Sequence, residues 1–76
     1  MDGVRTVDAK GLCCPVPIIE LAKAVRQISA GARVLLLATD PAVPADVRAW
    51  CDATGHRLVS IEPVEGGCRA LIEKAG

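Results

Sequence analysis

Residues 14–28 of this chain read CPVPIIELAKAVRQI, and they carry a clear helical pattern. Proline is tolerated in the first turn of a helix, where its missing N–H group has no partner to lose, so the two prolines suit a helix start. The apolar residues that follow recur with the period of an α-helix and share one stripe: Ile18, Leu21, Ala22, Val25 and Ile28. We therefore expect an amphipathic helix from Val16 to about Ser29, with Gly31 as a stop signal just beyond it.

Shorter patterned segments lie on both sides of this helix. A strand is expected near residues 4–7, and the unbroken apolar run 34–38 is typical of a central strand flanked by other strands. A second amphipathic helix is expected from about residue 44 to residue 54, followed by strands at 57–62 and 68–73. The order strand, helix, strand, helix, strand, strand predicts an α/β fold: a two-layer sandwich with a four-stranded mixed sheet and both helices on one face.

The composition fits one small globular domain. The chain has 76 residues, of which 51% are hydrophobic, so we expect a single domain over residues 1–76 with an aliphatic core. Nine basic and nine acidic residues cancel, which disfavours direct nucleic-acid binding and favours protein or small-molecule partners. No apolar run approaches the roughly 20 residues that span a bilayer, and we expect a cytoplasmic protein without membrane contact. In a reducing cytoplasm the four cysteines are expected to be free thiols.

Cys14 is the candidate reactive residue because it lies just before the predicted helix start. The positive end of a helix macrodipole favours a thiolate, so we expect the pKa of Cys14 to be slightly lowered. Lys10 would add positive charge nearby, whereas Pro15 and Pro17 remove backbone donors from the same end of the helix. This predicts an exposed, mildly activated thiol. The alternative is that Cys14 is a small buried side chain.

The remaining thiols give weaker indications. Cys13 is either a loop residue without a role or a second thiol that modulates the chemistry of Cys14. Cys51 lies on the apolar stripe of the second predicted helix and Cys68 on the apolar face of the last strand, so core packing is favoured for both, with Cys51 kept as a second candidate thiol. The spacing of the cysteines fits neither a zinc site nor a thioredoxin-type pair, and we expect no metal.

Asp40 and His56 lie on either side of the second predicted helix. Asp40 precedes Pro41 and is typical of a turn, although its carboxylate could also cap the next helix or hydrogen-bond the loop that carries Cys14. His56 follows Gly55, a helix stop, and is expected to begin a strand or lie on the surface rather than act as a catalytic base.

The run Cys14, Pro15, Val16, Pro17 resembles the signature of the TusA-like, or SirA-like, sulfur-carrier family. The similarity covers nearly the whole chain and includes Val7, Asp8, Gly11 and Leu12 before the signature, Thr39, Asp40, Pro41 and Ala42 after the second strand, and Cys51, Gly55 and His56 near the end of the second helix. The resemblance implies a strand-helix-strand-helix-strand-strand sandwich in which Cys14 is the working residue. The residues expected to support it are Gly11, Pro15, Pro17 and Asp40.

The resemblance also implies a function. Cys14 would accept sulfane sulfur as a persulfide from a cysteine desulfurase or a rhodanese-type donor and pass it to an acceptor protein. Routes known in the family are tRNA thiolation, molybdenum-cofactor formation and cytoplasmic oxidation of reduced sulfur. Such a protein is a sulfurtransferase that acts as a relay rather than as an independent enzyme. It needs no cofactor and is expected to be a monomer.

Cys13 and Val16 depart from the family pattern, in which many members carry polar residues at these positions. These two residues predict an unusually apolar rim around the site, which bears on the identity of the partner more than on the chemistry. An alternative function is a thiol-based redox-responsive regulator or a partner-binding module. Nucleic-acid binding is disfavoured by the zero net charge and by the scarcity of aromatic residues for base stacking.

Overall fold

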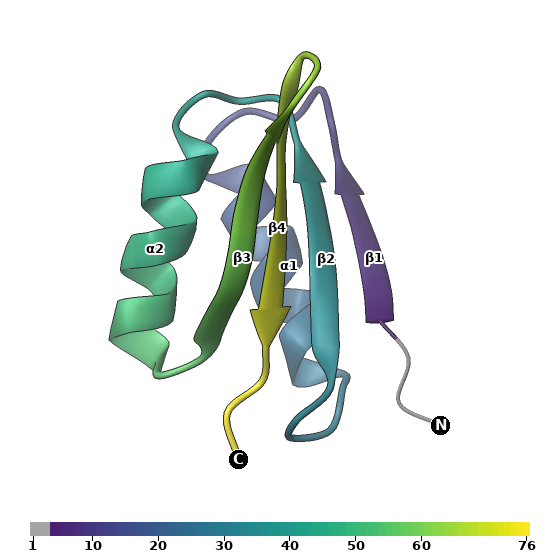
Figure 1. Ribbon diagram of the computed structural model, residues 1–76, viewed down its shortest axis with the longest axis vertical. Helices are drawn as coiled ribbons and strands as arrows, with labels where there is room; N and C mark the ends of the chain where they lie inside the picture. Colours follow the sequence, from purple (N-terminus) through teal and green to yellow (C-terminus); the bar gives the residue numbers. More distant parts are fainter. Residues whose placement is uncertain (1–3) are drawn as a thin grey trace.

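A computed structural model describes residues 4–76 of the chain. Its helices and strands follow one another in the predicted order, as Figure 1 shows. They are β1 (Val4–Ala9), α1 (Val16–Arg26), β2 (Arg33–Ala38), α2 (Val43–Thr54), β3 (Arg57–Val64) and β4 (Gly67–Glu73). In this described part of the chain, neither helix is long and apolar enough to cross a membrane.

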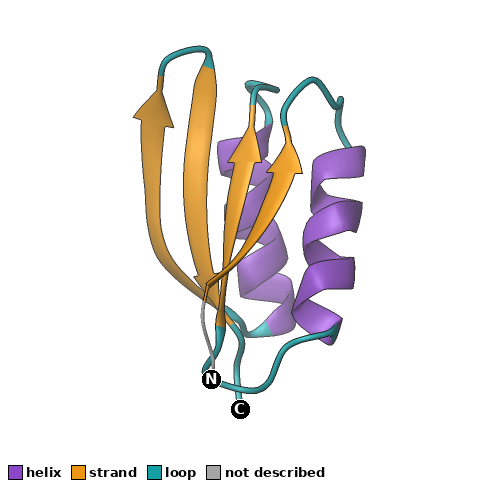
Figure 2. Ribbon diagram, turned by 90° about the vertical axis from the view of Figure 1, so that its right-hand side faces the viewer, coloured by secondary structure: helices purple, strands orange, loops and turns teal. Residues whose placement is uncertain are grey.

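The strands form a four-stranded mixed sheet in the order β1-β2-β4-β3. β1 pairs with β2 in parallel, with Ala9 opposite Ala38 at the end of the ladder, and the other two pairs are antiparallel. Figure 2 shows both helices on the same side of this sheet. The predicted two-layer α/β sandwich is therefore confirmed.

The element boundaries differ from the predicted ones where hydrogen bonding or pairing decides them. α1 ends at Arg26 rather than near Ser29, because the N–H groups of Gln27 and Ile28 bond to carbonyls three residues earlier and tighten the last turn. β3 continues through Pro63, which an edge strand tolerates because its outer side needs no ladder hydrogen bond. The ends of these elements thus depend on their neighbours as well as on their own sequence.

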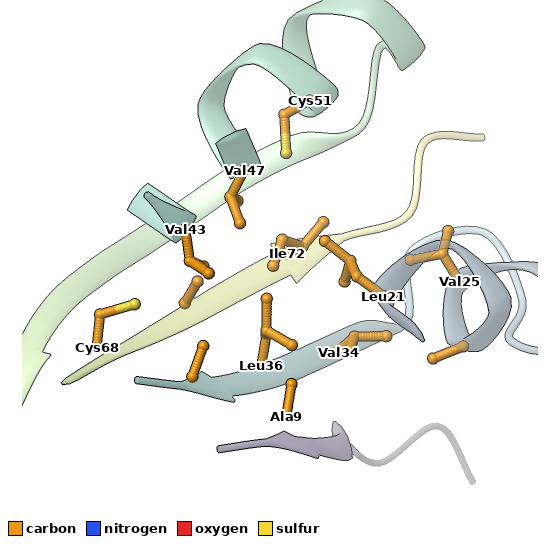
Figure 3. Close-up of a cluster of buried hydrophobic side chains, with 13 residues drawn as sticks. Ala9, Leu21, Val25, Val34, Leu36, Val43, Val47, Cys51, Cys68 and Ile72 are labelled. Atoms are coloured by element: carbon orange, nitrogen blue, oxygen red, sulfur yellow. The ribbon is translucent and has the colours of Figure 1, made fainter. Parts of the chain in front are cut away.

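The hydrophobic core lies between the sheet and the two helices, and Figure 3 shows side chains from both layers meeting there. Successive residues of a strand point to opposite faces, so every second residue of β2 and β4 is buried. The buried residues at this interface include Leu21, Val25, Val34, Leu36, Val43, Val47, Cys51, Cys68, Ala70 and Ile72. Cys51 and Cys68 are therefore core residues, as their sequence pattern predicted.

Both helices are anchored in the core at their first turn. Pro17 in α1 and Val43 in α2 are fully buried. These two contacts hold the helix starts close to the edge of the sheet where β1 and β2 end. The residues that precede each helix are therefore held in a defined position, although many of them are exposed.

Replacing Leu36 with alanine is expected to lower the free energy of unfolding by about 2–5 kcal/mol. Leu36 is fully buried in the middle of β2, so its truncation removes packing contacts and leaves a cavity. Urea unfolding measures the change. Val64→Ala, at the exposed end of β3, is the control and is expected to cost less than about 1 kcal/mol. Equal losses in the two variants would contradict this assignment of the core.

Candidate functional site

The parallel pairing of β1 and β2 brings two loops to the same edge of the sheet. Residues 10–15 follow β1, and residues 39–42 follow β2. Because the last residues of the two strands are paired, both loops leave the sheet side by side, at the top of Figure 1. The N–H of Gly11 donates to the hydroxyl oxygen of Thr39 at 2.9 Å, which joins the two loops directly.

The first loop holds Cys14 immediately before α1. Gly11 has a φ of +82°, a left-handed conformation that residues with a Cβ rarely adopt, so it allows the chain to turn after β1. The Cys14–Pro15 peptide bond is cis, and Pro15 occupies the N-cap position of α1. Pro17 is buried in the first turn of the helix. The loop is thus anchored on both sides of Cys14, which itself is exposed.

Asp40 connects the second loop to Cys14. Its Oδ2 accepts a hydrogen bond from the Cys14 N–H at 2.7 Å, and its Oδ1 accepts one from the Ala42 N–H at 2.8 Å. The bonds from Ala42 and Cys14 hold the pKa of the Asp40 carboxyl below its ordinary value, because they stabilise the carboxylate. Of the roles that the sequence left open for Asp40, the bond to the loop that carries Cys14 is observed, while Ala42 occupies the N-cap position of α2.

The Cys14 thiol faces a carboxylate from the second helix. Its Sγ donates a hydrogen bond to Oδ2 of Asp46 at 3.0 Å. This bond raises the pKa of Cys14 above its ordinary value, and desolvation and the negative charges of Asp46 and Asp40 act in the same direction. The prediction of a lowered pKa is therefore wrong, because a carboxylate in direct contact outweighs the weak field of a helix end. The alternative of a buried Cys14 is also wrong, since the side chain is exposed.

Asp46 is a site residue that the sequence pattern does not reveal. It lies off the apolar stripe of α2, where a charged side chain is ordinarily solvated. The available signal was topological: in consecutive parallel βα units, each helix starts at the carboxyl end of its strand, so the first turns of α1 and α2 lie at the same edge of the sheet. Asp46, in the first turn of α2, is therefore a spatial neighbour of Cys14, which precedes α1.

The other cysteines lie in two different environments. Cys13 is exposed beside Cys14, whereas Cys51 and Cys68 are buried, with 5% and 6% of their surface accessible. Burial raises the pKa of both core thiols. Figure 3 shows Cys51 on α2 and Cys68 on β4 within the core. As a second candidate thiol, Cys51 is therefore not accessible to a docking protein in this conformation.

No group of three or more His, Cys, Asp or Glu side chains is placed to hold a metal ion within residues 4–76. His56 lies after the C-terminal end of α2, whereas Cys14 and Asp46 lie near the helix starts. The Nδ1 of His56 accepts a hydrogen bond from the Ala75 N–H at 3.1 Å, and its ring centroid is 5.2 Å from that of Trp50. These contacts give His56 a structural environment: it is half-buried and lies one residue before β3, where the sequence predicted a strand start or a surface position.

Three exposed apolar side chains lie close to Cys14 in the chain, one in the preceding loop and two in the first turns of α1. Leu12, Val16 and Ile19 are 37%, 38% and 47% exposed. Leu12 and Val16 are two positions from Cys14 in the chain, and Ile19 follows Val16 by one turn on the same side of the helix. The prediction of an apolar rim rested on Cys13 and Val16, and of these two Val16 is an exposed apolar side chain. We use the name apolar rim for Leu12, Val16 and Ile19.

Asp40→Asn is expected to lower stability at neutral pH and to matter less in acid. Because the folded-state pKa of Asp40 is lowered, its carboxylate stabilises the protein above the unfolded-state value of about 3.9. This stabilisation is lost as the pH falls through the lower folded-state pKa. Thermal unfolding of both proteins from neutral pH into acid measures the difference. A gap in melting temperature that stays constant or widens in acid would contradict the role of Asp40.

Comparison with known proteins places the chain in a family. It matches the family model described as sulfurtransferase TusA over residues 5–74. The "Putative sulfur carrier protein YrkF" of Bacillus subtilis is 36% identical over 76 residues, which are 100% of this chain and 41% of that protein. The "Putative sulfur carrier protein" of Aquifex aeolicus is 32% identical over 71 residues, which are 93% of this chain and 36% of that protein. The chain therefore spans about two fifths of the length of these curated relatives.

The fold is also found in a solved structure. The crystal structure of the SirA-like protein from Desulfitobacterium hafniense matches with a TM-score of 0.80 and 24% sequence identity, covering 96% of this chain and 99% of that one. This likeness concerns the architecture of the sandwich. The family model covers all but a few residues of the described chain, including both loops of the site. Because the family model matches residues 5–74, the chain belongs to the TusA sulfurtransferase family.

Proposed function

We propose that this chain is a cytoplasmic sulfur carrier in which Cys14 accepts sulfane sulfur as a persulfide and passes it to an acceptor protein. The observation that carries this proposal is the contrast among the thiols. Cys14 is exposed at the start of α1 with its backbone held by Asp40, while Cys51 and Cys68 are buried. The two curated relatives are described as sulfur carriers, which supports the same chemistry.

The transfer needs only two thiol groups and one sulfane sulfur. A donor of the cysteine desulfurase or rhodanese type presents a persulfide, R–S–SH. The Cys14 sulfur attacks the terminal sulfur, the S–S bond of the donor breaks, and the leaving donor sulfur takes up the proton that Cys14 releases. The balance is R–S–SH + Cys14–SH → R–SH + Cys14–S–SH, with no net oxidation or reduction. A second exchange of the same kind delivers the sulfur to a thiol of the acceptor.

Other proteins, rather than free small molecules, are the proposed donors and acceptors. Within residues 4–76 the structure has five large hydrophobic side chains that are exposed, and three of them form the apolar rim. A protein surface that docks there would remove this apolar area from water. The acceptor would belong to tRNA thiolation, molybdenum-cofactor formation or sulfur oxidation. In each case a carrier with zero net charge would contact the protein rather than nucleic acid.

One exposed site on a small domain suits a monomer that visits donor and acceptor in turn. The proposed domain comprises residues 1–76, and the exposed sulfur at the edge of the sheet is open to either partner. Because both partners need the same face, they would bind one after the other. The carrier would therefore act as a relay and not as an independent enzyme.

A redox sensor is less well supported by the site. Sensor cysteines combine exposure with a low pKa, because the thiolate is the form that peroxide oxidises. Cys14 is exposed, but its contact with Asp46 raises its pKa. A slow reaction with dissolved oxidant is compatible with a carrier, because docking holds the reacting sulfur atoms together.

Cys14→Ser is expected to abolish sulfur loading. The purified, reduced protein is incubated with a cysteine desulfurase and cysteine, and its intact mass is recorded. The wild type should gain one or more sulfur atoms that a reductant removes. Cys51→Ser should still be loaded because the Cys51 side chain is buried in the core, and Cys13→Ser tests the neighbouring exposed thiol.

Two results would overturn the assignment of Cys14. One is loading that survives Cys14→Ser, and the other is loading that disappears in Cys51→Ser while that variant remains folded. If neither a desulfurase nor a rhodanese-type donor loads the wild type, the carrier proposal fails.

Ile19→Asp is expected to slow loading by a protein donor roughly tenfold, because it places a charge in the apolar rim where the donor would dock. Val4→Asp is the matched control: Val4 is also exposed but lies at the opposite end of β1 from the site. Rates of mass gain at low donor concentration measure both. Equal slowing in the two variants would show that the rim does not take part in docking.

A further inference from the structure

Cys14 and Asp46 come from different helices and meet at one hydrogen bond. Cys14 precedes α1, Asp46 lies in the first turn of α2, and Sγ donates to Oδ2 at 3.0 Å. The backbone holds both partners: the Cys14 N–H donates to Asp40, and the Asp46 N–H donates to the Ala42 carbonyl at 3.0 Å. The fold therefore places the carboxylate against the sulfur.

The charged groups that act on the Cys14 thiol are all acidic. They are the carboxylates of Asp46 and Asp40. A thiolate at this position would face the Asp46 carboxylate with no proton between the two atoms, and like charges in contact repel. The protonated thiol avoids this repulsion and keeps the hydrogen bond. The arrangement therefore favours the form of Cys14 that is the weaker nucleophile.

We propose that Asp46 is a positioning residue that holds the empty carrier in its unreactive thiol form until a partner protein docks and displaces this hydrogen bond. The inference rests on the proposed function, since it concerns the same sulfur atom. Asp46 would thereby make Cys14 selective for its donor. Small electrophiles, which do not displace the carboxylate, react slowly with Cys14, whereas a docked persulfide donor reacts readily. Asp40 has a different role, because it bonds to the backbone of Cys14 and not to its sulfur.

The restraint acts on the empty carrier and not on the loaded one. In a persulfide the inner sulfur of Cys14 carries no proton, so it cannot donate to Asp46. The terminal sulfur lies one S–S bond of about 2.05 Å farther out, beyond the atom that contacts the carboxylate. The hydrogen bond that holds the empty thiol, from Sγ to Oδ2 of Asp46, therefore has no equivalent at the inner sulfur of the loaded carrier.

Alkylation of Cys14 by iodoacetamide across a range of pH tests this proposal. All proteins carry Cys13→Ser so that Cys14 is the exposed thiol whose reaction is followed by mass. Asp46→Asn and Asp46→Ala are expected to react roughly threefold faster at neutral pH, because the gain in thiolate fraction exceeds the loss of nucleophilicity that accompanies a lower pKa. The midpoint of their pH profiles should move to lower pH. Asp52→Asn, an exposed position near the other end of α2, should follow the parent protein.

A profile that is unchanged in both Asp46 variants would overturn the proposal. Circular dichroism tests whether each variant is folded. If neither variant folds, the parent protein itself provides the test, because the midpoint for native Cys14 should lie at higher pH than the midpoint measured in concentrated urea. A native midpoint at or below the unfolded one would overturn the proposal equally.

Sulfur loading of the same proteins separates this inference from the proposed function. If the parent protein is loaded by a desulfurase but the Asp46 variants keep its alkylation profile, the role of Asp46 is wrong and the carrier function stands. If the Asp46 variants shift the pH profile of alkylation but no donor loads the parent protein, the carrier function is wrong, and the role of Asp46 in keeping Cys14 protonated stands.

Discussion

β1 and β2 run in parallel and end together at the pair Ala9 and Ala38, and this ladder determines where the site forms. Because the strands are parallel, the loop after each one emerges at the same edge of the sheet and leads directly into a helix. The Gly11 N–H can then bond to Thr39, and the Cys14 N–H to Asp40, although these pairs are 28 and 26 positions apart in the chain. Antiparallel pairing would have placed the two loops at opposite ends of the sheet.

The electrostatics of Cys14 show how one contact can reverse an effect of secondary structure. The start of α1 favours a thiolate through the helix macrodipole, a weak influence at an exposed position. The start of α2 contributes Asp46, whose carboxylate accepts the thiol hydrogen at 3.0 Å and raises the pKa of Cys14. The exposed sulfur is therefore accessible without being strongly ionised. This combination suits a carrier that exchanges sulfur within a complex better than a sensor of dissolved oxidants.

The difference in exposure between Cys14 and the core thiols follows from the two layers of the sandwich. Cys51 on α2 and Cys68 on β4 face the core, where they pack as small hydrophobic side chains. Cys14 lies in the loop between β1 and α1, outside the two layers, and is exposed. The apolar rim consists of Leu12 in the same loop and of Val16 and Ile19 in α1, and the proposed docking of partners would cover both the sulfur and these side chains.

The sequence by itself determined the element order, the fold class and the core positions of Cys51 and Cys68, and it made Cys14 the candidate reactive residue. Helical and strand periodicity and the prolines after Cys14 depend on neighbouring residues, so they can be recognised along the chain. The sequence could not determine where α1 ends or that β3 continues through Pro63, because hydrogen bonding decides the first and sheet pairing the second. It also left the bond between Asp40 and the Cys14 backbone as one option among several. Only the tertiary structure revealed Asp46 and the direction of the pKa shift of Cys14, since that contact spans 32 positions and requires both helix starts to lie at one edge of the sheet.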